Sequence, residues 1–239
     1  MNLEQVLAEL KKHPPEAQSQ ALIQHLRHKF DSDLYLLCKY GLGYSAMTRK
    51  THGPMCKILE EQLSRKLLVM PRGTFKSSIG VVGYSIASLT KDPNVRILID
   101  SEKYDNSKNF IREIKGKVSD PVFKLLYGDW IEGGSWTEGE VVISKRTIVK
   151  KEANLTASGI GAGKTGQHYD KILHDDLNSH ENSQNPEQRR KVLIHYKMNT
   201  SILDPGGEIV VIGTRYATDD VIGFILDNEV NPKGLLPSE

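Results

Sequence analysis

The spacing of hydrophobic residues changes near residue 66 of the chain. Before this point, apolar residues recur at intervals of three and four, as they do on one face of a helix. In the last such stretch they are Met55, Ile58, Leu59 and Leu63. The pattern predicts a helical N-terminal segment, with helices over residues 2–12, 15–30, 34–40 and 52–65.

After residue 66, short apolar runs alternate with amphipathic stretches. Strands are predicted over residues 67–70, 95–99, 171–174 and 208–212, and a hairpin over residues 141–143 and 147–149. Helices are predicted over residues 77–89, 107–118, 186–200 and 219–227. Strands separated by helices predict an α/β fold, with a mostly parallel sheet that carries helices on both faces.

Composition fits a folded protein that does not span a membrane. The 239 residues are 38% hydrophobic and 26% charged, as in globular proteins and unlike disordered tails. No uninterrupted apolar run approaches the ~18 residues of a membrane span, and the N-terminus lacks the apolar core of a signal peptide. The two cysteines, Cys38 and Cys56, cannot form a disulfide framework, which favours a reducing cytoplasm.

Two segments compete as a phosphate-binding P-loop, whose pattern is G-x-x-x-x-G-K-[ST]. Residues 158–165 lack only the first glycine, whereas residues 70–77 have Met70 and Phe75 in place of both glycines. A P-loop must lie between a strand and a helix, because backbone amides and the helix N-terminus cradle the phosphates. Only residues 70–77 lie between a predicted strand and a predicted helix, so this segment is the preferred loop.

Each segment also has a simpler interpretation. Residues 70–77 alone fit an ordinary turn from a strand to a helix, and residues 159–166 fit a flexible glycine loop. An acidic motif downstream favours the P-loop. In such a loop Lys76 would contact the β- and γ-phosphates, and the Ser77 hydroxyl would bind Mg²⁺.

The acidic motif is Asp175–Asp176, at the end of the predicted strand 171–174. In a P-loop ATPase the first acid holds the Mg²⁺ shell, and the second orients and deprotonates the attacking water. The alternative is a solvated acidic turn that caps the next helix. Thr214, after the strand 208–212, is placed to contact the γ-phosphate or the water, although it would also suit a helix or turn cap.

These motifs together resemble the large terminase subunit of tailed bacteriophages, the motor that packs DNA into proheads. The resemblance runs from about residue 52 to residue 227. Its most specific parts are residues 68–78, 165–176 and 206–216. Residues 182–192 also resemble the family's helix after the acidic pair.

The resemblance implies a P-loop NTPase fold of the ASCE (RecA-like) type that binds ATP and Mg²⁺. Arg72 matches the family's arginine within the loop, which would position or neutralise the γ-phosphate. Asp175 falls at the magnesium position with Ser77, Asp176 at the catalytic position and Thr214 in the coupling motif. The phosphate cradle would comprise Pro71, Arg72, Gly73, Thr74, Phe75, Lys76, Ser77 and Ser78.

The resemblance also implies an assembly. The expected partners are double-stranded DNA, a portal protein, the small terminase subunit and further copies in a ring on the prohead, in the host cytoplasm. In some members a basic residue before the acidic strand enters the neighbouring subunit's site. Lys164 lies nearest to that position, and Arg146, on the preceding predicted hairpin, is the second candidate.

The expected organisation is a helical segment over residues 1–50, an ATPase domain over 51–228 and a linker-like tail over 229–239. No nuclease activity is expected of this chain. Two other functions remain open: a helicase-like DNA motor, and a nucleotide-binding scaffold with little hydrolysis. Phe75 and the short Asp176 support the scaffold, whereas a helicase would need a second RecA-like domain.

Overall fold

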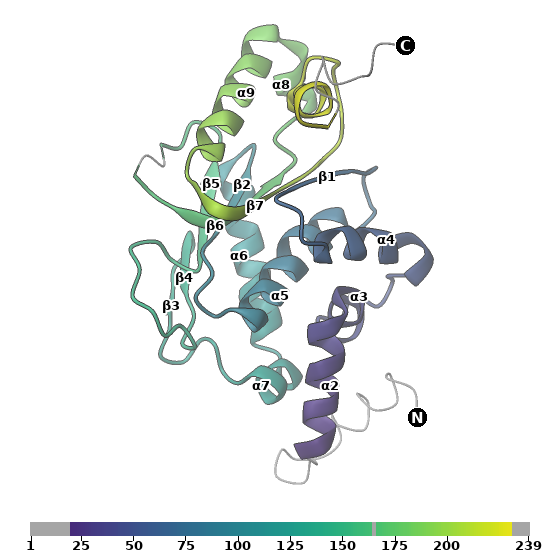
Figure 1. Ribbon diagram of the computed structural model, residues 1–239, viewed down its shortest axis with the longest axis vertical. Coiled ribbons are helices and arrows are strands. Elements are labelled where there is room, and N and C mark those ends of the chain that lie inside the picture. Colours follow the sequence, from purple (N-terminus) through teal and green to yellow (C-terminus); the bar gives the residue numbers. More distant parts are fainter. Residues whose placement is uncertain (1–19, 164–165, 231–239) are drawn as a thin grey trace.

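The computed structural model describes residues 20–163 and 166–230, and these residues form a seven-stranded sheet with helices on both faces (Figure 1). In chain order the strands are β1 (Arg65–Val69), β2 (Ile97–Ser101), β3 (Ser135–Trp136), β4 (Glu140–Val142), β5 (Leu155–Gly159), β6 (Tyr169–Asp175) and β7 (Leu203–Gly213). Across the sheet the order is β1-β7-β6-β2-β5-β4-β3. The first five of these are parallel, and β4 and β3 are antiparallel. The predicted α/β fold is confirmed.

The helical elements in the described ranges cover the sheet and its N-terminal approach. The α-helices are α2 (Gln20–Ser32), α3 (Leu34–Leu36), α4 (Arg49–Glu60), α5 (Tyr84–Lys91), α6 (Tyr104–Val118), α7 (Pro121–Tyr127), α8 (His180–Gln184), α9 (Pro186–Thr200) and α10 (Val221–Ile225). The π-helical turns are η2 (Leu37–Gly41), η3 (Ser78–Gly83) and η4 (Leu226–Val230). Helices α5 and α6 lie on one side of the sheet and α9 on the other (Figure 1).

Each face of the sheet has its own buried core, and successive strand residues alternate between the two. On β6, Leu173 joins the cluster beneath α5 and α6, whereas Ile172 joins the cluster beneath α9. On β7, Val210 and Val211 divide in the same way. Because both faces are buried, these strands appear in the sequence as continuous apolar runs.

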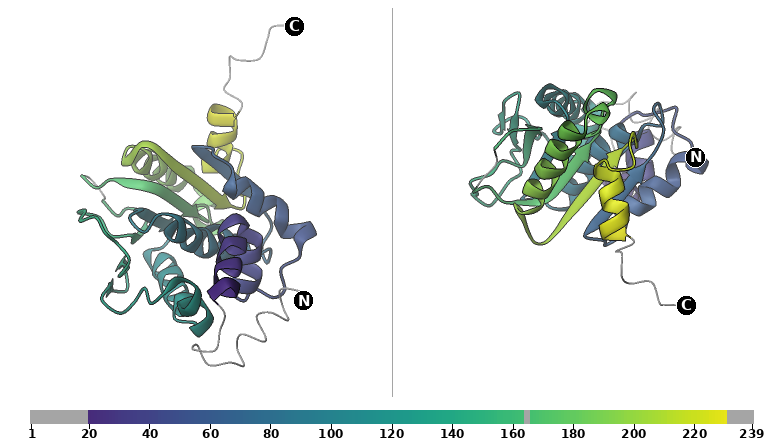
Figure 2. Two further views of the ribbon diagram at one scale, coloured as in Figure 1. Left: turned by 60° about the horizontal axis from the view of Figure 1, so that its bottom comes forward. Right: turned by 90° about the horizontal axis from the view of Figure 1, so that it is seen from above.

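The N-terminal helices share the core of the sheet. Leu26 and Phe30 of α2 and Met55 of α4 belong to the same cluster as Ile79 and Ile212. These helices lie on the α5 and α6 side of the sheet (Figure 2). The predicted helix over residues 2–12 lies outside the described residues, and the division at residue 50 stays a prediction.

The predicted hairpin over residues 141–143 and 147–149 is wrong. Strand β4 pairs instead with β3 and β5, and residues 147–149 form a loop in which Val149 is 99% exposed. The side chain of Asn94 fixes this loop by accepting from the amides of Thr147 and Ile148 at 3.0 and 2.9 Å. The apolar residues at positions 147–149 predicted a strand, but hydrogen bonds to the distant side chain of Asn94 determine the backbone conformation there.

Candidate active site

The loop of residues 70–75 leads from β1 directly into a helix. The helix starts at Lys76 and continues through η3 into α5. The rival glycine segment connects β5 to β6, with no helix among its described residues on either side of positions 164–165. The prediction that only the first loop precedes a helix is confirmed for the described residues. Lys164 lies outside them.

Two residues of the loop have left-handed backbone conformations. Gly73 has a φ of 78°, and nothing lies within 4 Å of a Cβ built there. Phe75, at the position of a consensus glycine, has a φ of 54°. The hydroxyl of Thr74 donates to the carbonyl of Pro71 at 2.8 Å and closes the turn. The loop therefore makes left-handed turns at Gly73 and Phe75, although it lacks both consensus glycines of the P-loop pattern.

The acidic pair lies at the carboxyl end of β6. Asp175 ends this strand, and Asp176 follows with a φ of 43°. Because β7 lies between β1 and β6, the ends of those two strands are about 10 Å apart. The first residues of the helix can bridge that separation with their side chains.

Four of the predicted site residues meet in two pairs across this separation. The ammonium of Lys76 donates to Asp176 Oδ2 at 2.5 Å. The hydroxyl of Ser77 donates to Asp175 Oδ1 at 2.7 Å. Residues about 100 positions apart in the sequence therefore converge at one edge of the sheet.

Burial controls the charge of the first acid. It raises the pKa of Asp175 to about 6; the Ser77 hydrogen bond opposes this rise, and the neighbouring charge of Asp176 adds to it. The Lys76 side chain is only 6% exposed, whereas that of Asp176 is 40% exposed. The site therefore combines a buried cation, a buried acid and an acid that solvent can reach.

Strand β7, which lies between β1 and β6, ends at the same edge of the sheet. The amide of Asp176 donates to the carbonyl of Ile212 at 2.9 Å, and that of Met70 to the carbonyl of Gly213 at 3.2 Å. Thr214 donates through its hydroxyl to the Met70 carbonyl at 3.2 Å. The predicted coupling residue thus contacts the start of the predicted phosphate loop.

Tyr216 is a residue of this edge that the sequence did not single out. Its hydroxyl accepts a hydrogen bond from the exposed Arg72 guanidinium at 2.7 Å. Its amide donates to the buried carboxylate of Asp220 at 2.9 Å. Its position just after Thr214 was the available signal, but its partner Arg72 lies 144 residues away.

A second polar cluster that the sequence analysis missed lies behind the acidic pair. The carboxylate of Asp100, at the end of β2, is fully buried. It contacts the imidazoles of His174 and His195 at 2.9 Å each and accepts from the amide of Asn199 at 3.0 Å. Burial alone would raise the pKa of Asp100, but these histidine contacts hold it well below its usual range. The cluster joins α9 to the strand that carries the acidic pair.

The residues at this edge fit a magnesium–nucleotide complex. The Ser77 hydroxyl and the Asp175 carboxylate are hard oxygen ligands, which Mg²⁺ prefers together with water and phosphate. The Oδ1 atom of Asp176 is buried and has no hydrogen-bond partner among the described residues. No group of three or more His, Cys, Asp or Glu in the described ranges could hold a metal by itself. A few protein oxygens that share the cation with phosphate suit Mg²⁺ better than a full protein cage does.

Other features lie away from this edge. Arg146, the second candidate for a residue acting in trans, donates to the carbonyls of Ile148 and Glu152 at 2.9 and 2.8 Å.

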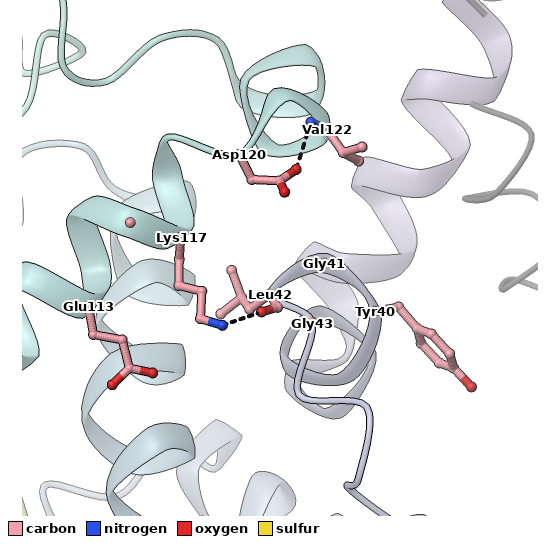
Figure 3. A pocket seen from close by; sticks show the side chains of 9 residues that line it. Tyr40, Gly41, Leu42, Gly43, Glu113, Lys117, Asp120 and Val122 are labelled. Carbon is pink, nitrogen blue, oxygen red and sulfur yellow. Dashed lines mark hydrogen bonds between the residues drawn. The ribbon is translucent and has the colours of Figure 1, made fainter. Parts of the chain in front are cut away.

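A cavity of about 460 Å³ lies between η2 and α6, and none of the four residues of the two pairs lines it (Figure 3). Across the described residues, no helix combines the length and apolar character that a membrane crossing requires.

The raised pKa of Asp175 predicts how stability changes with pH. A carboxyl group with a folded pKa of about 6 holds a proton that the unfolded chain releases near pH 4. Its contribution to stability is therefore complete below about pH 4 and is lost as pH rises through about 6. The loss amounts to about 3 kcal/mol of the unfolding free energy.

Asp175→Asn should remove this pH dependence, because the amide can still accept from Ser77 and does not ionise. In the presence of a chelator and without nucleotide, the variant's stability relative to the wild type should grow by about 2 kcal/mol between about pH 4.5 and about pH 8. Urea unfolding at the two pH values measures this. Parallel changes in the two proteins would show that Asp175 titrates normally.

The comparisons with known proteins agree with the fold. No family model matches the sequence, and no curated protein matches it. Among solved structures, the crystal structure of the HK97 bacteriophage large terminase matches with a TM-score of 0.58 and 12% identity, over 85% of this chain and 42% of that chain. This chain therefore spans less than half of that terminase. The α/β fold implied by the sequence resemblance is confirmed: the protein shares the fold of part of a bacteriophage large terminase.

Proposed function

We propose that this chain is the ATPase motor of a viral terminase, which hydrolyses ATP to translocate double-stranded DNA into a prohead. The observation that carries the proposal is the convergence of the phosphate loop with the acidic pair. Lys76 pairs with Asp176 at 2.5 Å. Ser77 pairs with Asp175 at 2.7 Å. Phosphoryl transfer needs this set of groups: a cation for the β- and γ-phosphates, oxygens for Mg²⁺ and a base for water.

In the proposed site each residue has one task. Bound Mg²⁺ would offset charge on the phosphate oxygens, with Ser77 and Asp175 as its protein ligands. Lys76 would leave Asp176 and contact the phosphates, which frees the Asp176 carboxylate to accept a proton from water. Arg72 would turn from Tyr216 toward the γ-phosphate, and the backbone of residues 71–78 would cradle the other phosphates.

The proposed partners follow from the terminase likeness. The matched HK97 protein is a large terminase, and its fold extends over 85% of this chain. We propose double-stranded DNA, a portal protein and a small terminase subunit as partners, in the host cytoplasm. The proposed working form is a ring of this chain on the prohead, with residues 51–228 as the ATPase unit.

Phosphate release from ATP tests the proposal. The purified chain should release phosphate slowly in the presence of Mg²⁺, and faster when it is assembled with DNA on proheads that carry a portal. Tight nucleotide binding with no release under either condition would favour the nucleotide-binding scaffold. Stimulation by DNA alone, with strand separation, would favour the helicase-like motor.

Mixed rings test whether a basic residue acts in trans. A subunit with Lys164→Ala or Arg146→Ala keeps its Asp176, and a subunit with Asp176→Asn keeps both basic residues. Mixing the two should restore turnover if the basic residue stabilises the transition state in the neighbouring subunit, an effect worth about 10³–10⁵ in rate. If no mixture exceeds the sum of the separate activities, neither residue acts across the interface.

A further inference from the structure

Phe75 holds an unusual place in the phosphate loop. It directly precedes Lys76 and occupies the position of a consensus glycine. Its φ of 54° lies in the left-handed region, which bulky residues rarely adopt. A residue in such a conformation persists only when its surroundings hold it there.

The surroundings that hold Phe75 come from Tyr44 and His52, which precede β1 in the chain. Its ring lies edge-on to the imidazole of His52, with the ring centres 5.6 Å apart and an interplanar angle of 79°. It also meets the ring of Tyr44 at 6.0 Å. Both partners are buried, and Phe75 packs against the larger core cluster, which includes Tyr44. Edge-on and tilted arrangements at these distances are favourable aromatic contacts.

Tyr44 is itself fixed by α6. Its hydroxyl donates to Glu113 at 2.6 Å, and the ammonium of Lys117 lies 4.3 Å from the centre of its ring. Lys117 also donates to the carbonyl of Leu42 at 2.7 Å, so that it reaches from α6 to the end of η2 (Figure 3). Contacts therefore run without a break from α6 through Tyr44 to the phosphate loop.

We propose that Phe75 is a positioning residue of the nucleotide site, and that Tyr44 and His52 hold it in place. The inference rests on the proposed nucleotide-binding function of the loop. Glycine at this position would permit the left-handed backbone but leave the loop free to adopt other conformations. The anchored ring instead fixes the peptide groups on both sides of Phe75 before a phosphate arrives. Tyr44 and His52 would thereby support the proposed ATP site without contacting the nucleotide.

Two variants separate the ring from the backbone conformation. Phe75→Gly keeps the left-handed backbone accessible, but it removes the ring and leaves the loop free to adopt other conformations. Tyr44→Leu leaves the loop sequence intact and removes one supporting ring. Each should weaken binding of a non-hydrolysable ATP analogue with Mg²⁺ by about three- to tenfold, the size of an aromatic contact. Each should also speed amide hydrogen exchange of residues 74–76 in the nucleotide-free protein.

The double variant identifies the contact. Once Phe75 is glycine, Tyr44→Leu should cause little further loss of affinity, because the two rings act through each other. Tyr127→Leu is the matched control, since the Tyr127 hydroxyl also donates to a carboxylate, at 2.9 Å, and Arg27 lies 5.6 Å from its ring. It should leave nucleotide affinity and loop exchange unchanged. Thermal unfolding of each variant shows whether the fold is kept.

The outcomes distinguish this inference from the proposed function. If Lys76→Ala loses the nucleotide while Phe75→Gly binds as tightly as the wild type, the loop is functional and the anchor is not needed. Fully additive effects of the Phe75 and Tyr44 substitutions on nucleotide affinity would also contradict the proposal that the two rings act together. If Lys76→Ala binds the analogue normally, the proposed function itself fails.

Discussion

Lys76→Ala is expected to abolish ATP hydrolysis while the protein remains folded. The Lys76 ammonium is buried at the carboxyl edge of the sheet and has Asp176 as its partner. A fixed cation in such a site stabilises the phosphate charge that develops during transfer, and loss of one such group costs about 10²–10³ in rate. Nucleotide affinity should fall as well, because in the proposed site the lysine would contact the phosphates before and during transfer.

Folding should survive this substitution. Asp176 loses its partner, but its side chain is 40% exposed and can be hydrated. Phosphate release and analogue binding, with a thermal unfolding curve for each protein, measure the effect. The matched control is Lys164→Ala, in the rival glycine segment, which should leave nucleotide binding by the monomer nearly unchanged. Loss of binding in the control but not in Lys76→Ala would show that the other segment is the phosphate loop.

The choice between the two loops shows what the sequence could predict. The glycine segment matched the motif better, yet the segment ending in Lys76 and Ser77 leads into the helix. The apolar runs on both sides of that loop and before Asp175 were sufficient to predict these elements, because central parallel strands are buried on both faces and appear as continuous apolar runs. Local context therefore predicted the strand–loop–helix arrangement, which the number of matching glycines did not.

Other features depended on contacts that no local pattern reveals. Strand β5 was missed because its sequence, Leu-Thr-Ala-Ser-Gly, has few large apolar residues, although every one of its residues is buried. The left-handed backbone of Phe75 depends on rings from an earlier segment. The Asp100 cluster joins β2, β6 and α9 over separations of 74 to 99 residues. Such contacts are decided by tertiary packing, which a single sequence does not show.

The acidic pair provides the other large effect, since its two members should fail in different ways. Asp176→Asn keeps the size of the side chain and removes the base, so nucleotide and Mg²⁺ should still bind while turnover falls by about 10²–10⁴. Asp175→Asn removes the charge beside Ser77 and should weaken Mg²⁺-dependent nucleotide binding instead. Single-turnover hydrolysis and analogue titrations with and without Mg²⁺ separate the two effects.

The contrast rests on the different environments of the two carboxylates. Asp175 is buried against Ser77, whereas Asp176 is partly open to solvent. Each variant is the control for the other, because both replace a carboxylate with an amide at neighbouring positions. Equal and mild losses of binding and turnover in both would mean that the pair is a solvated turn. A large loss of turnover in Asp176→Asn, with Mg²⁺-dependent affinity intact, assigns the base to Asp176.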